Sequence, residues 1–144
     1  MTPRQIDTVR STWAEIERHG TLHLVLRFHA ALADLARARQ PSRRRAIEAQ
    51  GRRLLELLPL AVGDCDAPPE RLTSVVAAAL GRMAREDATA GGDDDLVQAA
   101  LLRALARLPC GRQSAEAEAA WQALSAALAA AVARARDGAA VRAA

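Results

Sequence analysis

Few side chains in this sequence could ligate a metal or act as a nucleophile. The 144 residues include three histidines and two cysteines but no tyrosine. Cys65 and Cys110 do not stand in the Cys-x-x-Cys or Cys/His spacing of metal sites. No order of Ser, His and Asp, or of Cys and His, indicates an activated nucleophile, and no paired carboxylates lie in an apolar stretch. We therefore expect neither an enzyme nor a metal site. We interpret His19 as a surface residue and His23 as a residue of the apolar face or of the surface.

Arginine carries all the basic charge, because the twenty basic residues include no lysine and the formal net charge is +3 at pH 7. Arg43–Arg45 and Arg52–Arg53 cluster along the chain. Such a cluster could hold an anionic ligand, for example a carboxylate, by bidentate hydrogen bonds, or it could be a solvated helix face. Aromatic residues make up only 2% of the chain, so stacking platforms for bases are lacking and we expect no nucleic-acid partner.

The elements that position these side chains are predicted to be helices of one globular domain. Hydrophobic residues make up 51% of the chain and are mostly Ala and Leu, which favour helix over strand. Thr2-Pro3-Arg4-Gln5 predicts a capping box, Gly20 a helix end, and the aspartates before Leu96 a helix start. Six or seven helices are expected, with long helices ending near 19 and spanning about 21–35, 43–62, 70–83, 96–108 and 114–136.

Four further expectations follow from local patterns. Residues 37–45 form a basic corner or short helix, Pro59 kinks the third long helix, and a short disordered tail begins near residue 137. Hydrophobic spacing predicts a broad buried face on the second helix, made by Leu22, Val25, Leu26, Phe28, Leu32 and Leu35.

The sequence contains no apolar stretch long enough for a membrane span, since the Ala-rich run 123–132 is too short. It begins directly with a helix signal, without a leader-like apolar run. We therefore expect a cytoplasmic protein with reduced cysteines and no membrane partner.

Five short stretches along the chain form an ordered set: Thr2-Pro3-x-Gln5-Ile6-x-x-Val9-x-x-Thr12-Trp13, Gln50-Gly51-Arg52-Arg53-Leu54, Leu80-Gly81-Arg82, Val97-x-Ala99-Ala100-Leu101-Leu102, and Ser114-Ala115-Glu116 followed by Ala120-Trp121. This set resembles the bacterial single-domain haemoglobins and the globin domain of flavohaemoglobins. The family spacing is kept without a gap from Phe28 to Gln50 and from Leu80 to Trp121. The resemblance covers nearly the whole chain and implies a single-domain globin fold.

The resemblance also implies that the haem-binding positions have changed. The family's iron-ligating histidine corresponds to Ala84, whose methyl group cannot be an axial ligand. The phenylalanine that stacks on the porphyrin corresponds to Arg43, and the distal tyrosine to His29. The distal glutamine is retained as Gln50, with Leu54 one turn further along the same face. Two other family aromatics correspond to Ala33 and Asp94.

We therefore expect a haem-free globin-like protein that serves as a small-ligand-binding or sensory module, with no cofactor. Small residues at 33 and 84 would leave a residual cavity for an apolar or anionic ligand. The expected pocket residues are Phe28, His29, Arg43, Gln50, Leu54, Met83, Ala84, Val97 and Leu101.

Two alternatives stay open at this point. The first is a haem-binding, oxygen-carrier type of globin that uses His29 or Met83 as an atypical axial ligand. The second is a helical dimerisation module, in which the last two helices form a homodimer. The small-residue face of the last helix would allow such an approach, through Ala119, Ala123, Ala126, Ala127, Ala130 and Ala131.

Overall fold

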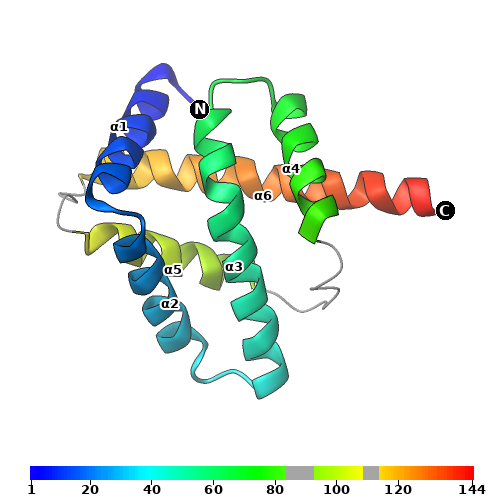
Figure 1. The fold of residues 1–144 in the computed structure, drawn as a ribbon, viewed down its shortest axis with the longest axis horizontal. Helices are drawn as coiled ribbons and strands as arrows, with labels where there is room; N and C mark the ends of the chain where they lie inside the picture. The colour runs from blue at the N-terminus through cyan, green and yellow to red at the C-terminus, as the bar shows by residue number, and fades with distance from the viewer. Residues whose placement is uncertain (84–92, 109–113) are drawn as a thin grey trace.

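The computed structural model describes residues 1–83, 93–108 and 114–144, and it places six α-helices and no strand in these ranges (Figure 1). The helices are α1 (Pro3–His19), α2 (Leu22–Ala36), α3 (Pro41–Gly63), α4 (Pro69–Met83), α5 (Asp94–Ala106) and α6 (Ala115–Ala143). The expectation of an all-helical chain is confirmed.

Short polar signals fix where the helices begin. Thr2 and Gln5 form the expected capping box, in which each side chain pairs with the backbone of the other. Asp93 accepts from the backbone N–H of Leu96 at the start of α5, and Ser114 caps α6. Gly20 follows the end of α1 with φ of 90°, a conformation that favours glycine.

The longest helix, α6, passes behind α1, α3 and α4 and forms the back of the core (Figure 1). Trp121 on α6 is completely buried, and its ring centroid lies 6.5 Å from that of Trp13 on α1. α2 packs against α5 and α3, and α4 packs against α6. The helices thus surround a continuous apolar core.

The contact between α2 and α3 is especially close at Gly51. A Cβ atom at this position would lie 2.6 Å from Cδ2 of Leu32 and 3.1 Å from Cε1 of Phe28. Both neighbours are buried, so neither side chain can swing into solvent. The lack of a side chain at residue 51 therefore sets how near α2 and α3 can approach.

Three predicted boundaries or faces differ from the structure. α6 continues to Ala143, so the expected disordered tail from residue 137 is wrong; alanine-rich segments have the highest helix propensity. α3 begins at Pro41, so Arg43–Arg45 of the basic corner belong to this helix, whereas residues 37–40 form a turn before it. Pro59 lies inside α3. Leu22 and Leu26 are 63% and 59% exposed, because only one side of α2 meets α3 and α5.

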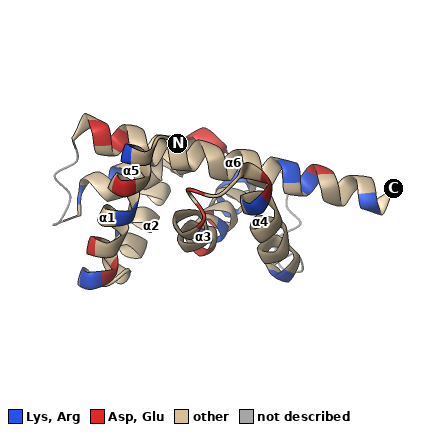
Figure 2. Cartoon of the chain, turned by 90° about the horizontal axis from the view of Figure 1, so that it is seen from above, with Lys and Arg blue, Asp and Glu red and all other residues tan. Residues whose placement is uncertain are grey.

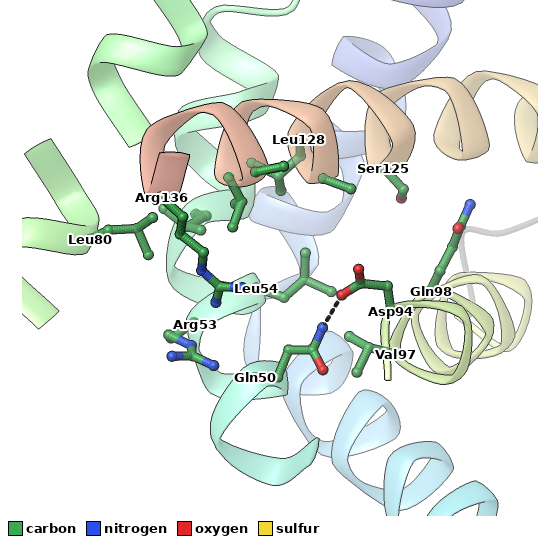
Figure 3. A pocket seen from close by; sticks show the side chains of 14 residues that line it. Gln50, Arg53, Leu54, Leu80, Asp94, Val97, Gln98, Ser125, Leu128 and Arg136 are labelled. Atoms are coloured by element: carbon green, nitrogen blue, oxygen red, sulfur yellow. Dashed lines mark hydrogen bonds between the residues drawn. The ribbon is translucent and has the colours of Figure 1, made fainter. Parts of the chain in front are cut away.

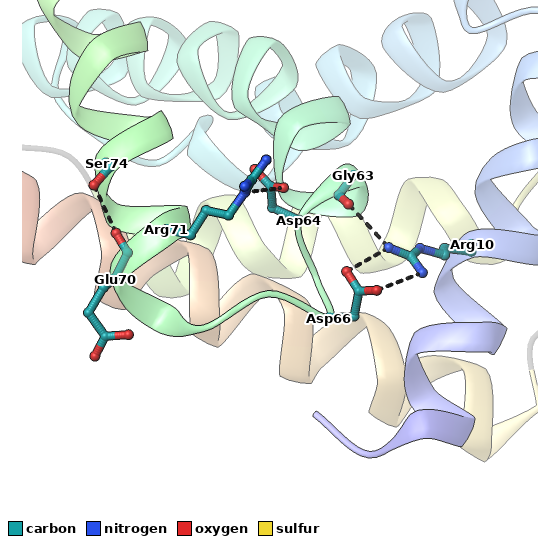
Figure 4. A network of polar contacts seen from close by, with 7 residues as sticks. All are labelled: Arg10, Gly63, Asp64, Asp66, Glu70, Arg71 and Ser74. Atoms are coloured by element: carbon teal, nitrogen blue, oxygen red, sulfur yellow. Dashed lines mark hydrogen bonds and ion pairs between the residues drawn. The ribbon is translucent and has the colours of Figure 1, made fainter.

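A polar clasp, made by Arg10, Gly63 and Asp66, ties α1 to the end of α3 and the turn that follows it (Figure 4). Arg10 donates two hydrogen bonds to the Asp66 carboxylate, at 2.8 and 3.2 Å, and a third to the carbonyl of Gly63. The Arg10 hydrogen bond lowers the pKa of Asp66 below its ordinary value. The clasp is exposed to solvent, so it orients the turn more than it stabilises the fold.

Charge is arranged along α6 in the sense that suits the helix dipole. Acidic residues lie in its N-terminal part and arginines near its C-terminal end (Figure 2). Anionic side chains near a helix start and cationic ones near its end are favourable. None of the helices in the described ranges is both long and apolar enough to cross a membrane.

Candidate ligand pocket

A pocket of about 140 Å³ opens between α3, α5 and α6, with Leu80 of α4 at one end (Figure 3). Its lining residues are Gln50, Arg53, Leu54, Leu57, Leu80, Asp94, Val97, Gln98, Ser125, Leu128, Ala129, Val132, Ala133 and Arg136. Leucine, valine and alanine side chains form most of the wall. Such an apolar lining with a few polar groups is typical of small-molecule sites.

Gln50 joins α3 to the start of α5 at one edge of this pocket. Its amide nitrogen donates to the carboxylate of Asp94, and its amide oxygen accepts from the backbone N–H of Asp93 at 2.8 Å. Both functional ends of the amide are therefore engaged within the protein (Figure 3). Gln50 thus connects α3 to α5.

Asp93 completes this joint from the other side. One carboxylate oxygen accepts from the backbone of Leu96, and the other pairs with Arg39 at 3.3 Å. The first turn of α5 is thus held by residues that precede and follow the start of α3. This arrangement places Asp94 and Val97, one turn apart, along the pocket.

Ser125 on α6 contributes a polar atom that lacks a partner. The residue is only 9% exposed, and no group in the described part of the chain forms a hydrogen bond with its Oγ. Leaving a buried hydroxyl unpaired costs about 1–3 kcal/mol. Ser125 lines the pocket, whereas Trp121, whose buried Nε1 also lacks a partner among the described residues, does not. A ligand in the pocket could supply the missing hydrogen bond to Ser125.

Two arginines line the opposite end of the pocket. Arg136 extends from α6 toward the side on which Arg53 of α3 lies (Figure 3). Arg136 is exposed and makes no ion pair with any residue that the structure describes. Arg136 therefore brings a positive charge, without an ion pair among the described residues, to this end of the pocket.

Three of the nine predicted pocket residues, Gln50, Leu54 and Val97, do line the pocket. Phe28 and Leu101 do not, because both are completely buried in the core between the helices.

The remaining predicted residues lie elsewhere or cannot be placed. His29 is half-buried with its ring edge-on to Phe28, and Arg43 is exposed on the first turn of α3. Met83, at the end of α4, is half-buried against the core. None of these three lines the pocket. Ala84 lies outside the described residues.

The residues of this pocket do not fit haem. Among the described residues, its lining has no His, Cys, Met or Tyr that could be an axial ligand to iron. A cavity of about 150 Å³ accepts a benzene molecule, and a porphyrin is several times larger than benzene. The present space is thus suited to a compact molecule rather than to a macrocycle.

Other kinds of chemistry find little support in the described residues. They contain no group of three or more His, Cys, Asp or Glu that could hold a metal ion. Cys65 is half-buried in the turn beside the clasp, and burial raises the pKa of its thiol, which keeps it protonated. The thiol is therefore poorly suited to act as a nucleophile.

Sequence reasoning missed Ser125 and Arg136, which define the two ends of the pocket. The alanine-rich pattern of α6 offered no sign that either residue faces α3, and Arg136 stood at the predicted helix end. Asp94 was identified only as the counterpart of a family tyrosine. The structure shows instead that it bonds to Gln50.

Comparison of the chain with protein-family models, curated proteins and solved structures found no match.

Proposed function

We propose that this chain is a haem-free, globin-like protein whose pocket between α3, α5 and α6 binds a small molecule. The ligand has an apolar body and at least one group that can form a hydrogen bond. The observation that carries this proposal is Ser125, a lining residue of the pocket whose buried Oγ has no hydrogen-bond partner among the described residues.

Size and polarity support this proposal. A space of about 140 Å³ is close to that of an engineered cavity of about 150 Å³ that takes up benzene. Leu54, Leu57 and Leu128 offer an apolar surface that water solvates poorly. A ligand that also bonds to Ser125 would remove the cost of the unpaired hydroxyl. Its binding would therefore be favoured both by burial of apolar surface and by this hydrogen bond.

The globin-like part of the proposal rests on order and position. Six helices occur in the described ranges, and the counterparts of the family's distal helix and penultimate helix supply Gln50, Leu54 and Val97 to one pocket. The position of the pocket also supports a sensory role, because a bound ligand would contact three helices at once.

Calorimetric titration with phenol tests the binding function. We expect saturable binding at one site, which Ala129→Phe abolishes because the added ring occupies the pocket. Ala130→Phe is the matched control. Ala130 is the next residue of the same helix, is also exposed, lies about 100° further round the helix, and is not part of the lining. Absence of saturable binding, or equal effects of the two substitutions, would overturn the proposal.

Titration with haemin tests the competing function. We expect no sharp Soret band that saturates at one haem per chain, because the lining offers no axial ligand. A stoichiometric Soret band that shifts on substitution of His29 or Met83 would instead establish a haem protein.

A further inference from the structure

The polar groups of the pocket are divided between its two ends. Ser125 and Arg136 lie on one face of α6, eleven residues and therefore about 16 Å apart along the helix axis. Leu128 and Val132 lie between them on the same helix, and Leu54 faces them from α3 (Figure 3). A ligand that fills this space has one end near a hydroxyl and the other near arginines.

The charges of the pocket are unequal. Its ionisable lining residues are Arg53, Arg136 and Asp94. The Asp94 carboxylate already accepts a hydrogen bond from Gln50, whereas Arg136 makes no ion pair with the described residues. The guanidinium of Arg136, which has no ion pair with these residues, favours a negatively charged group at this end, and a carboxylate matches the fork of a guanidinium.

The other end lacks a cation among the described residues. Ser125 offers a hydroxyl there, and the neutral amide of Gln98 and the carboxylate of Asp94 lie on the same side of the pocket (Figure 3). An anionic group placed at this end would approach the Asp94 carboxylate and be buried without a counter-ion, at high cost. A neutral hydroxyl can both donate to and accept from these groups.

We propose, on the basis of the function proposed above, that the pocket selects a compact aromatic carboxylic acid with a neutral polar group opposite the carboxylate. The carboxylate lies at Arg136, the ring lies against Leu54 and Leu128, and the polar group bonds to Ser125. The inference deepens the proposed function by naming the class of ligand.

The test compares three molecules by calorimetry. The first is para-hydroxyphenylacetate; the second is tyrosol, in which a neutral alcohol replaces the carboxylate; the third is phenylacetate, which lacks the ring hydroxyl. We expect para-hydroxyphenylacetate to bind about tenfold more tightly than either of the others, as one charge-assisted or neutral hydrogen bond is lost in each case.

Two substitutions assign the preference to its residues. Arg136→Gln should bring the affinities for para-hydroxyphenylacetate and tyrosol to within about twofold, while Arg142→Gln, near the end of α6 and outside the lining, leaves the ratio unchanged. Ser125→Ala should bring the affinities for para-hydroxyphenylacetate and phenylacetate to the same value. Because surface charges are screened, the advantage of the acid over tyrosol should also fall as salt is raised from about 0.1 to 1 M.

The outcomes separate the two proposals. If tyrosol binds as tightly as the acid, or Arg136→Gln and Arg142→Gln act alike, the preference for an anion is overturned while the binding function stands. If none of the three molecules binds, both are overturned.

Discussion

Gly51 offers a sharp test of how α2 and α3 pack. Gly→Ala in the interior of a helix normally stabilises a protein by about 0.5–1 kcal/mol, since alanine loses less backbone entropy on folding. At Gly51 the added methyl group would meet Leu32 at 2.6 Å and Phe28 at 3.1 Å, inside the core. Overpacking of a core costs about 1–3 kcal/mol. We therefore expect Gly51→Ala to lose most or all of the normal gain and to be destabilised by up to about 2 kcal/mol.

Gly81→Ala provides the control within the same chain. Gly81 lies in α4, is exposed, and has no atom within 4 Å of its added Cβ. This substitution should give the full gain of about 0.5–1 kcal/mol. The two variants should thus differ in unfolding free energy by about 1–3 kcal/mol, the cost of overpacking alone.

Urea unfolding followed by circular dichroism measures this difference. With a slope of about 2 kcal/mol per molar urea, a gap of about 2 kcal/mol separates the two midpoints by about 1 M. Equal midpoints for Gly51→Ala and Gly81→Ala would refute the reasoning, because they would mean that α2 and α3 do not approach as closely as the structure places them.

Three further predictions concern the clasp, the pocket and association. Asp66→Asn should lower stability at neutral pH, and this loss should shrink as the pH falls below about 4 and vanish below the folded-state pKa. The reason is that Arg10 depresses the folded-state pKa of Asp66, so the contribution of the carboxylate is full above the unfolded pKa and is lost as the pH falls through the folded one. Urea midpoints measured at neutral pH and at decreasing acid pH check this, and a difference that stays constant would contradict it. Ser125→Ala without ligand should raise the unfolding free energy by about 1 kcal/mol, because the hydroxyl is buried without a partner among the described residues. A decrease of similar size would contradict this, because it would show that the hydroxyl has a hydrogen-bond partner. A homodimer through the last two helices is expected in sedimentation velocity, since Ala126 and Ala130 of α6 are exposed, and a monomer unchanged up to high micromolar concentration would count against it.

The parts of the fold that could be predicted from the sequence depend on local interactions. Thr2 and Gln5 are three residues apart, and Asp93 lies three residues before the N–H that it accepts from, so their pairing can be predicted from spacing alone. The end of α1 at Gly20 is also a local effect, because glycine readily adopts the positive φ found there. Hydrophobic spacing was less exact on α2, where Leu22 and Leu26 belong to the apolar stripe but extend beyond the area that α3 and α5 cover.

The parts of the pocket that could not be predicted depend on distant contacts. The partners of Gln50 lie more than forty residues further along the chain, at Asp93 and Asp94. No sequence pattern around Gln50 distinguishes a glutamine that binds a ligand from one that forms hydrogen bonds to another helix. Ser125 and Arg136 likewise line the pocket only because α6 packs beside α3 in the folded chain, and this packing cannot be predicted from the sequence around either residue.

The joint at Gln50 couples the pocket to the first turn of α5. Leu54 lies one turn after Gln50 on α3, so a ligand that shifts Leu54 also shifts the amide that holds Asp93 and Asp94. Because ligand binding and formation of this joint are linked equilibria, each affects the other by the same free energy. If the ligand stabilises the joint, breaking the joint weakens ligand binding by the same amount. The amide hydrogen of Asp93, which the Gln50 side chain covers, is therefore a reporter of occupancy, and its rate of exchange with solvent should register a ligand that never touches it.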